Sequence, residues 1–158
     1  MGIGPSTKET TLHHFRDPLL SVLSEDQDLD LLGIVIAGIP QDNENKYFTG
    51  ERVAAWLEAM RADGAVVSED SWGNSSVDFA HAIEEIGKRG ISVVGVSFVG
   101  TQAQFVVSNE YMDTIVDINK SAEGIETNVV GENNLDERDA RKAAALLKLK
   151  MRKRENGK

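Results

Sequence analysis

Two neighbouring carboxylates, Glu69 and Asp70, come closest in this sequence to a spacing that supports acid–base chemistry. They follow the apolar stretch AVVS, so they stand where a strand would end, and neighbouring carboxylates in such a place are usually solvated. The serines beside them, Ser71, Ser75 and Ser76, have no histidine at a spacing that would provide a general base. Helix capping explains these serines better than nucleophilic catalysis does. The stretch therefore indicates the polar end of a strand followed by the start of a helix.

Histidine and cysteine offer little further chemistry. The chain has three histidines and no cysteine, which excludes disulfides, thiolate metal ligands and a cysteine nucleophile. His13 and His14 are neighbours that would point to opposite faces of a strand, while His81 stands alone in a helical stretch. We therefore expect neither a metal site nor a cofactor.

The charge of the chain is acidic and unevenly distributed. The net charge is −9, but the stretch from Arg141 to Lys158 carries eight Lys or Arg and one Glu. The preceding 140 residues therefore hold nine basic and 25 acidic side chains, and a body this acidic repels nucleic acid and anionic lipid. We expect neither as a partner. The basic end is typical of a helix C-terminus that complements its dipole.

The sequence also favours a cytoplasmic location. Its longest apolar run, Leu31 to Ile39, is far too short to span a bilayer. The N-terminal stretch MGIGPSTKETT lacks a charged region followed by an apolar one, so we expect no secretion signal.

Three apolar stretches are typical of buried strands: LLGIVIAGI at 31–39, AVVSED at 65–70 and ISVVGVSFVG at 91–100. Helical patterns at about 50–62 and 77–88 separate them. Alternation of this kind predicts a parallel sheet with right-handed crossovers. The expected fold is a single α/β domain, in which a mainly parallel sheet of three to five strands is flanked by helices and followed by a C-terminal helix.

Capping residues place the helices. The first helix, at about 50–62, would begin after Thr49, and the second, at about 77–88, would end at KRG. A terminal helix at 135–154 would be capped by Asn134 or its neighbour. The side chains expected on the inward faces of the first two helices are Val53, Trp56, Leu57, Met60, Phe79, Ile83 and Ile86.

Two stretches leave their secondary structure open. PLLSVL, at 18–23, is compatible with a short strand or one helical turn, and NEYMDTIVDINK, at 109–120, with a helix or a strand. The expected organisation is an N-terminal head at 1–30, an α/β core at 31–134, and a basic C-terminal helix and tail at 135–158.

Polar loops follow each expected strand, at 39–50, 69–76 and 98–104, whereas the opposite loops, ADG and KRG, are minimal. Loops after parallel strands meet at one edge of a sheet, where ligands usually bind. The alternative is that these residues only form turns and caps. The residues expected on a substrate or partner edge are Asp42, Asn43, Tyr47, Thr49, Glu51, Asp70, Trp72, Asn74, Thr101, Gln102, Asn109, Glu110, Glu132 and Asn133.

Common nucleotide motifs are missing. The glycine spacing of GIVIAG, at 33–38, does not match a dinucleotide fingerprint, and the sequence has no Walker loop. Trp72, beside Gly73, is either a stacking platform or a loop anchor.

Four stretches together carry a family resemblance: IPQDN at 39–43, YFTGERVAAWLEAMRADGAVVS at 47–68, the long stretch DSWGN to QFVV at 70–107, and NEYMDTIVDINKSAEGIETNVVGEN at 109–133. They resemble the pyruvoyl-subunit proproteins of D-proline reductase and, more distantly, the component B proteins of the glycine, sarcosine and betaine reductases. The resemblance covers about residues 30–150.

This resemblance implies a self-processing precursor. In the family, a cysteine in the segment matching IETNVVGEN marks the cleavage point and becomes a pyruvoyl group, whose carbonyl binds the substrate amine while a selenocysteine subunit supplies the selenol. Here Asn128, between Thr127 and Val129, occupies the matching position. A carboxamide cannot replace a thiol as nucleophile and leaving group, so we expect an intact chain with no catalytic residue of its own.

Three functions follow from the resemblance. The chain is similar to the short, separately encoded proline-reductase-associated proteins, which implies an assembly, maturation or accessory role in Stickland-type D-proline reduction. The alternatives are a substrate-binding subunit of the reductase and an amino-acid binder or sensor. We expect D-proline reductase subunits as partners and a homo-oligomer, because homologous subunits inherit self-complementary patches. The basic terminal helix offers a further contact for an acidic neighbour.

Overall fold

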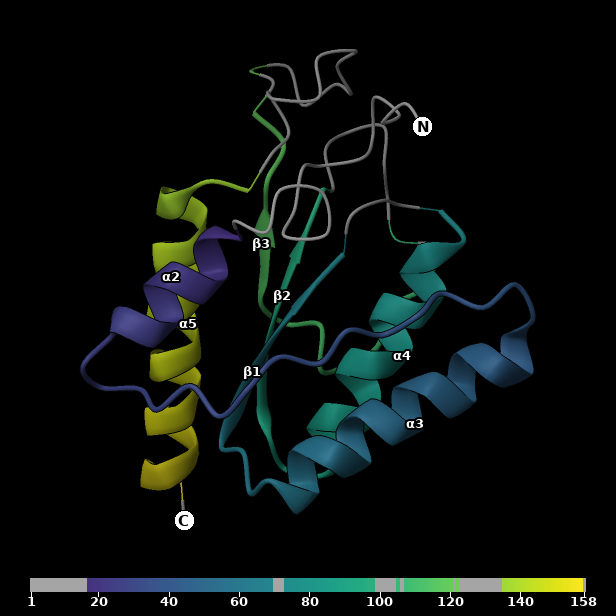
Figure 1. Ribbon diagram of the computed structural model, residues 1–158, viewed down its shortest axis with the longest axis horizontal. Helices are drawn as coiled ribbons and strands as arrows, with labels where there is room; N and C mark the ends of the chain where they lie inside the picture. The colour runs from purple at the N-terminus through teal and green to yellow at the C-terminus, as the bar shows by residue number, and fades with distance from the viewer. Residues whose placement is uncertain are drawn as a thin grey trace.

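The computed structural model describes residues 17–69, 73–98, 105, 107–120, 122 and 135–157. Along the chain the elements are α2 (Pro18–Glu25), α3 (Asn43–Ala59), β1 (Gly64–Ser68), α4 (Ser75–Lys88), β2 (Ser92–Ser97), β3 (Ile115–Asp117) and α5 (Glu137–Asn156). The three strands form one parallel sheet in the order β1-β2-β3 (Figure 1). The expected α/β domain with a C-terminal helix is confirmed.

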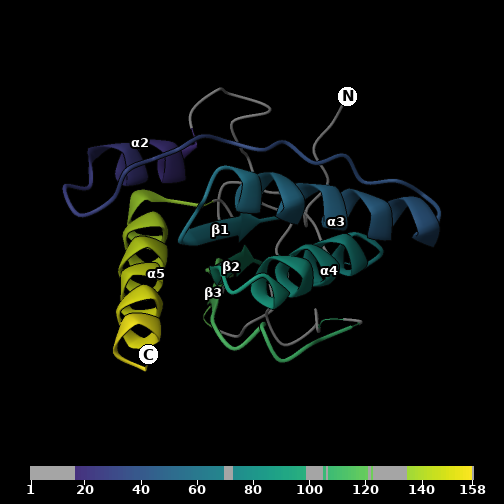
Figure 2. The ribbon, with the colours of Figure 1, turned by 90° about the horizontal axis from the view of Figure 1, so that it is seen from below.

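Helices cover both faces of the sheet (Figure 2). α4 packs on one face with α3 beside it, and α5 packs on the other face with α2 against it. Each face has its own apolar core: Val94 and Val96 of β2 pack towards α5, whereas Val93 packs among the residues of α4. The apolar stripe of α5 is thus covered by its own sheet.

β2 is the centre of the fold, and all six of its residues are buried. Its glycine, Gly95, pairs with Ile115 of β3 and donates from its backbone nitrogen to Thr114 O at 3.0 Å. A Cβ at Gly95 would lie 2.4 Å from Ile115 Cδ1 and 2.7 Å from Phe79 Cζ. A side chain at this position would therefore separate α4 and β3 from the central strand.

The expected strand at 31–39 is the main error of the sequence prediction. The segment lies between α2 and α3 in no secondary structure, and Leu32, Ile34, Ile36 and Ile39 are 51–74% exposed. Leu31 and Val35 are partly buried, and Val35 packs against the core cluster that includes residues of α3. The apolar pattern predicted the preference for an extended backbone but could not specify a neighbouring strand.

α3 begins seven residues earlier than predicted. Asp42 is the N-cap, and its side chain accepts from the backbone nitrogen of Asn45 at 2.9 Å. Thr49, the predicted cap, lies inside the helix and donates from its hydroxyl to Asn45 O at 2.8 Å. A strong aspartate cap upstream therefore extends the helix through Gly50.

The inward face of α3 also differs from the prediction. Leu57 is buried as expected, but Trp56 and Met60 are 52% and 40% exposed. α3 meets α4 along a narrow stripe that includes Gly50 and Ala54, so the larger residues beside that stripe stay outside.

The other helices follow the prediction more closely. α4 carries Phe79, Ile83 and Ile86 into the core, as expected. α5 begins after Asp136 rather than Asn134, because Asp136 and Asp139 form a reciprocal capping box. Of the two open stretches, PLLSVL lies within α2, and part of 109–120 forms β3.

Candidate functional site at the carboxyl edge of the sheet

A buried carboxylate marks the carboxyl ends of β1 and β2. Glu69 follows β1 directly and is only 8% exposed, and its backbone nitrogen donates to Val96 O at 3.1 Å. Ser97, the last residue of β2, donates its hydroxyl to Glu69 Oε1 at 2.5 Å, and Ser75 Oγ lies 3.5 Å from Oε2. Because Ser75 begins α4, the carboxylate also lies beside the positive end of that helix dipole.

A buried ion pair joins the first turns of α3 and α4. Lys46 is fully buried, and its ammonium group donates to Asp78 Oδ2 in a short contact. The second carboxylate oxygen, Asp78 Oδ1, is buried and has no hydrogen-bond partner among the described residues. Such a pair adds little net stability over apolar residues, but loss of one partner leaves an uncompensated buried charge.

His81 lies one turn beyond Asp78 on the same helix. Its ring meets Tyr47 edge-on, with 4.8 Å between the ring centroids, and its Nδ1 is 3.6 Å from Glu84 Oε2. Its Nε2 is buried without a partner among the described residues. Gly50 permits this packing, because a Cβ there would lie 2.7 Å from His81 Cδ2.

The α3 and α4 N-termini bring several predicted site residues to the same edge. Asn74 is the N-cap of α4 but makes no side-chain capping bond, and Tyr47 touches His81. Asp42 is occupied as a cap, and its hydrogen bonds from the Asn45 side chain and backbone lower its pKa. Asn43, Thr49 and Glu51 lie on the N-terminal half of α3.

The remaining predicted residues divide into two groups. Asn109 donates from Nδ2 to Ala80 O at 2.8 Å, and Glu110 lines a hollow at the opposite edge of the sheet, so Glu110 does not join the carboxyl-edge residues. The others lie outside the described residues, and the convergence of the three loops stays a prediction. These are Asp70, Trp72, Thr101, Gln102, Thr127, Asn128, Val129, Glu132 and Asn133.

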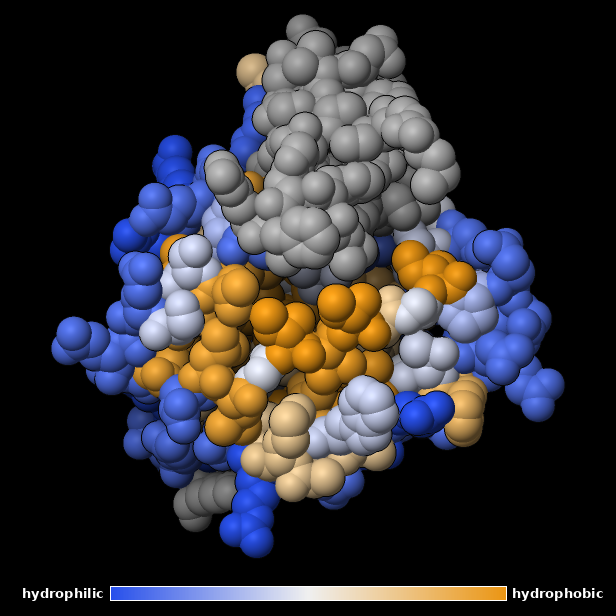
Figure 3. Space-filling view, in the orientation of Figure 1, coloured by the Kyte–Doolittle hydropathy of each residue, from blue (hydrophilic) through white to orange (hydrophobic). Residues whose placement is uncertain are grey.

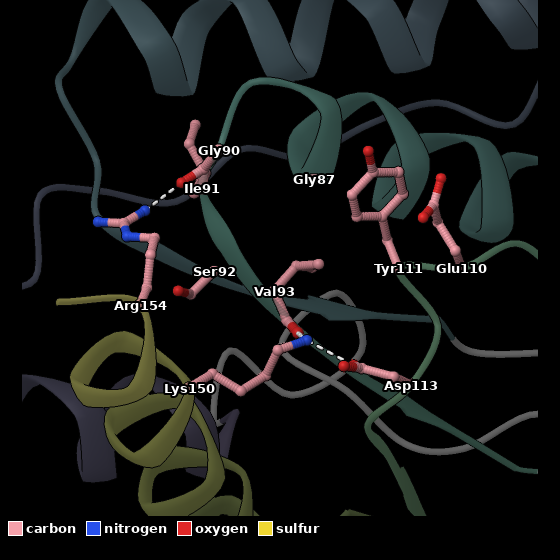
Figure 4. Close-up of a pocket in the computed structure, with 10 residues that line it drawn as sticks. All are labelled: Gly87, Gly90, Ile91, Ser92, Val93, Glu110, Tyr111, Asp113, Lys150 and Arg154. Carbon is pink, nitrogen blue, oxygen red and sulfur yellow. Dashed lines mark hydrogen bonds and ion pairs between the residues drawn. The ribbon is translucent and has the colours of Figure 1, made fainter. Parts of the chain in front are cut away.

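The hollow at the amino-terminal edge, of about 230 Å³, is lined by the C-terminal end of α4, the start of β2 and basic residues of α5 (Figure 4). Lys150 donates to Val93 O at 2.9 Å and to Asp113 Oδ1 at 2.5 Å. Arg154 donates to Gly90 O and pairs with Asp63. These cations fix α5 to the sheet, so the hollow is explained by packing.

Many of the basic side chains of α5 therefore form ion pairs and hydrogen bonds within the chain itself. Lys148 pairs with Asp26 at 2.7 Å and with Asp28 at 3.2 Å, which joins α5 to the end of α2. The expected contact with an acidic neighbour must therefore rely on the more exposed cations, such as Arg152.

Sequence reasoning missed the groups that the structure buries. Glu69 was considered but discounted as solvated. Lys46 was assigned to a loop, because the start of α3 was predicted seven residues too far along the chain. The available signal was helical spacing: Lys46, Gly50 and Ala54 recur every four residues, which places the lysine on the inward stripe of α3.

Two absences concern the described part of the chain, one of metal-ligand clusters and one of helices of membrane-spanning length. No group of three or more His, Asp or Glu side chains there could hold a metal ion. None of the described helices is both long and apolar enough to cross a bilayer.

Comparison with known proteins gives the family. The family model for glycine/sarcosine/betaine reductase component B subunits matches residues 2–139. The D-proline reductase proprotein of Acetoanaerobium sticklandii is 42% identical over 92% of this chain, and the alpha subunit of the sarcosine reductase complex component B of Peptoclostridium acidaminophilum is 26% identical over 58%.

These matches cover 23% and 22% of the two relatives, so the chain corresponds to less than a quarter of either protein. No solved structure matches. The chain belongs to the family of glycine/sarcosine/betaine reductase component B subunits.

Proposed function

We propose that this chain is a non-self-processing accessory protein of D-proline reduction, which acts in the assembly or maturation of the reductase. One observation carries the proposal: 92% of the chain aligns at 42% identity with a D-proline reductase proprotein, yet the chain has no cysteine. Most of the chain therefore aligns with the proprotein, but the cysteine at which the resemblance places self-cleavage is absent.

The chemistry of cleavage explains why this absence matters. A side-chain thiol or hydroxyl attacks the preceding carbonyl through a five-membered ring, and the resulting ester or thioester is then lost by β-elimination. Asn128, which lies outside the described residues, carries a carboxamide that can do neither step in this way. The chain therefore forms no pyruvoyl group and supplies no reactive carbonyl to a substrate amine.

The buried charged groups at the carboxyl edge of the sheet are consistent with a chain that keeps the shape of its relatives without their reactive group. Glu69 is held by Ser97, and Lys46 is neutralised by Asp78, so each charge has its partner within the chain. Such groups maintain the geometry of an edge without requiring a bound molecule. An accessory protein needs this shape because it works through surfaces shared with the catalytic relative.

A second function, amino-acid binding, is favoured by one specific observation. Two buried polar atoms near this edge, Asp78 Oδ1 and His81 Nε2, have no partner among the described residues, and buried polar groups normally do. An amino acid offers an ammonium group, which is complementary to Asp78 Oδ1, and a carboxylate group, which can accept a hydrogen bond from His81 Nε2. This function would make the chain a substrate-binding subunit or a sensor.

Two binding measurements separate these functions. We expect the purified chain to form a stable complex with a purified D-proline reductase proprotein in size-exclusion chromatography. The sarcosine reductase component B alpha subunit, a more distant relative, is the matched control and should bind much more weakly. Equal binding to both, or to neither, would remove the proposed specificity for proline reduction.

Calorimetry with D-proline and L-proline tests the second function. The accessory role predicts no saturable heat with either enantiomer. Saturable binding that is lost in Asp78→Asn or His81→Ala would favour the amino-acid binder instead.

A further inference from the structure

Residues 31–39 form an extended apolar segment without a strand partner. No backbone hydrogen bond from residues 30–41 to any described residue is present, although the segment lies between two helices of the same fold. Leu32, Ile34 and Ile36 are 52%, 62% and 74% exposed. A β-branched sequence with free backbone donors and acceptors is a template for pairing with another strand.

Between Leu32 and Ile36 the side chains of this segment alternate between two faces. Val35 points into the core cluster that includes residues of α3, whereas Leu32, Ile34 and Ile36 on either side of it are exposed. The segment runs alongside α3 in both ribbon views. Figure 3 shows hydrophobic surface gathered across the centre of this face, where the segment crosses it.

We propose that this segment pairs antiparallel with the same segment of a second copy of the chain, about a two-fold axis at Ile34. In this register Ile34 faces Ile34 of the second copy, and Leu32 faces Ile36 of the second copy. Directly opposite residues in an antiparallel pair lie on the same face, so all three exposed aliphatic positions meet aliphatic positions. The segment is therefore self-complementary.

Charge also permits a second copy. The chain carries a net charge of −9, but residues 31–41 contain no charged side chain, so the pairing brings no like charges together within this segment.

Sedimentation of the full chain tests the pairing. We expect a dimer at micromolar concentration, and Ile34→Lys should raise its dissociation constant by about a hundredfold or more, because the two-fold axis places both introduced charges together. The matched control is Leu149→Lys on α5, where the wild-type leucine is 48% exposed but lies outside the segment. This variant should dimerise like the wild type.

The absence of cysteine allows a direct test of the register. Ile34→Cys introduces the only thiol of the chain, and cross-strand Cβ atoms at such a position come close enough for a disulfide. Mild oxidation should give a covalent dimer of Ile34→Cys, whereas Leu149→Cys at the same concentration should remain largely monomeric in denaturing gels.

Two results would overturn the proposal. One is a wild-type monomer at micromolar concentration, and the other is a dimer that Ile34→Lys leaves intact. Equal cross-linking of the two cysteine variants would also reject the two-fold register. The inference does not depend on the accessory role, because dimerisation is measured on the chain alone, whereas that role is tested by binding to the reductase proprotein.

Discussion

β2 and the segment 31–39 have similar amino-acid compositions and opposite environments. Both are rich in β-branched residues, both contain glycine, and both were predicted as buried strands. All six residues of β2 are buried between two layers of helices, whereas Ile34 and Ile36 are more than half exposed. The difference lies in what each segment has beside it.

Chain connectivity does not account for this difference. α4 leads from β1 back across the sheet and delivers β2 into parallel register with it, from Gly64 opposite Ser92 to Ser68 opposite Val96. The segment 31–39 is likewise followed by a helix, α3, and then by β1, yet no backbone hydrogen bond joins the segment to that strand. Strand-forming residues thus determine the backbone preference, while contacts between distant segments determine whether a strand partner exists.

The largest expected contrast comes from placing an aspartate in each region. Val94→Asp buries an unpaired carboxylate at a position with no exposed surface and should unfold the domain, with a loss of about 4 kcal/mol or more. Ile36→Asp should change the free energy of unfolding by less than about 0.5 kcal/mol when measured on dilute, monomeric protein. Urea denaturation followed by circular dichroism distinguishes the two, and equal losses would contradict the assignment of 31–39 to the surface.

Substitution of a buried lysine should likewise reduce stability far more than substitution of an exposed one. Lys46→Ala leaves Asp78 buried without its ion partner and should cost about 3–5 kcal/mol of stability. Lys142→Ala, on the exposed face of α5, should cost about 0.5 kcal/mol or less. Asp78→Asn combined with Lys46→Met should recover part of the loss, and a double variant no more stable than Lys46→Ala would contradict the pairing.

Alanine substitutions at two glycines, one in β2 and one in the segment 31–39, should differ in stability by a smaller amount. Gly95→Ala in β2 forces a Cβ against Ile115 and Phe79 and should destabilise the chain by about 1–3 kcal/mol. Gly38→Ala meets nothing within 4 Å and should be neutral or slightly stabilising, because alanine restricts the unfolded chain. Thermal unfolding of both variants measures the difference, and a destabilised Gly38→Ala would reveal packing around the segment that the structure does not show.

The smallest expected effect is on acid stability. Burial tends to raise the pKa of Asp113, but the hydrogen bonds to its carboxylate, from Lys150 and Thr114 above all, and the charge of Lys150 together outweigh burial, and the pKa is lowered. A lowered carboxyl pKa stabilises the fold above the unfolded value, near pH 4, and that stabilisation is lost as the pH falls further. Asp113→Asn should therefore lower the melting temperature slightly at pH 7 and reduce the further loss of melting temperature as the pH falls below about 4. An unchanged acid transition would show that this pair contributes nothing.

Much of the fold followed from local patterns. The helical period of α4 and its terminal KRG placed both its inward face and its end, and the apolar run of β2 predicted its burial. The start of α3 did not follow, because Asp42 and Thr49 are both acceptable caps in sequence, and the packing of Gly50 against His81, which fits the longer helix that Asp42 caps, is a contact between distant residues.

The site was harder to predict than the fold. Asp42 and Asn74 were expected from loop composition, and both lie at helix N-termini on the carboxyl edge. Glu69 and Lys46 were missed because a charged residue looks the same in sequence whether it is solvated or buried against Ser97 or Asp78. Their burial depends on contacts between distant segments, which no local pattern contains.

The central claim is that this chain contributes surfaces rather than a reactive carbonyl, and intact-mass spectrometry of the purified protein tests it most directly. We predict a single polypeptide of 17.2 kDa that does not react with a hydrazide reagent. Fragments of 127 and 31 residues, with a hydrazide-reactive terminus on the shorter one, would show cleavage before Asn128 with pyruvoyl formation and would contradict the account.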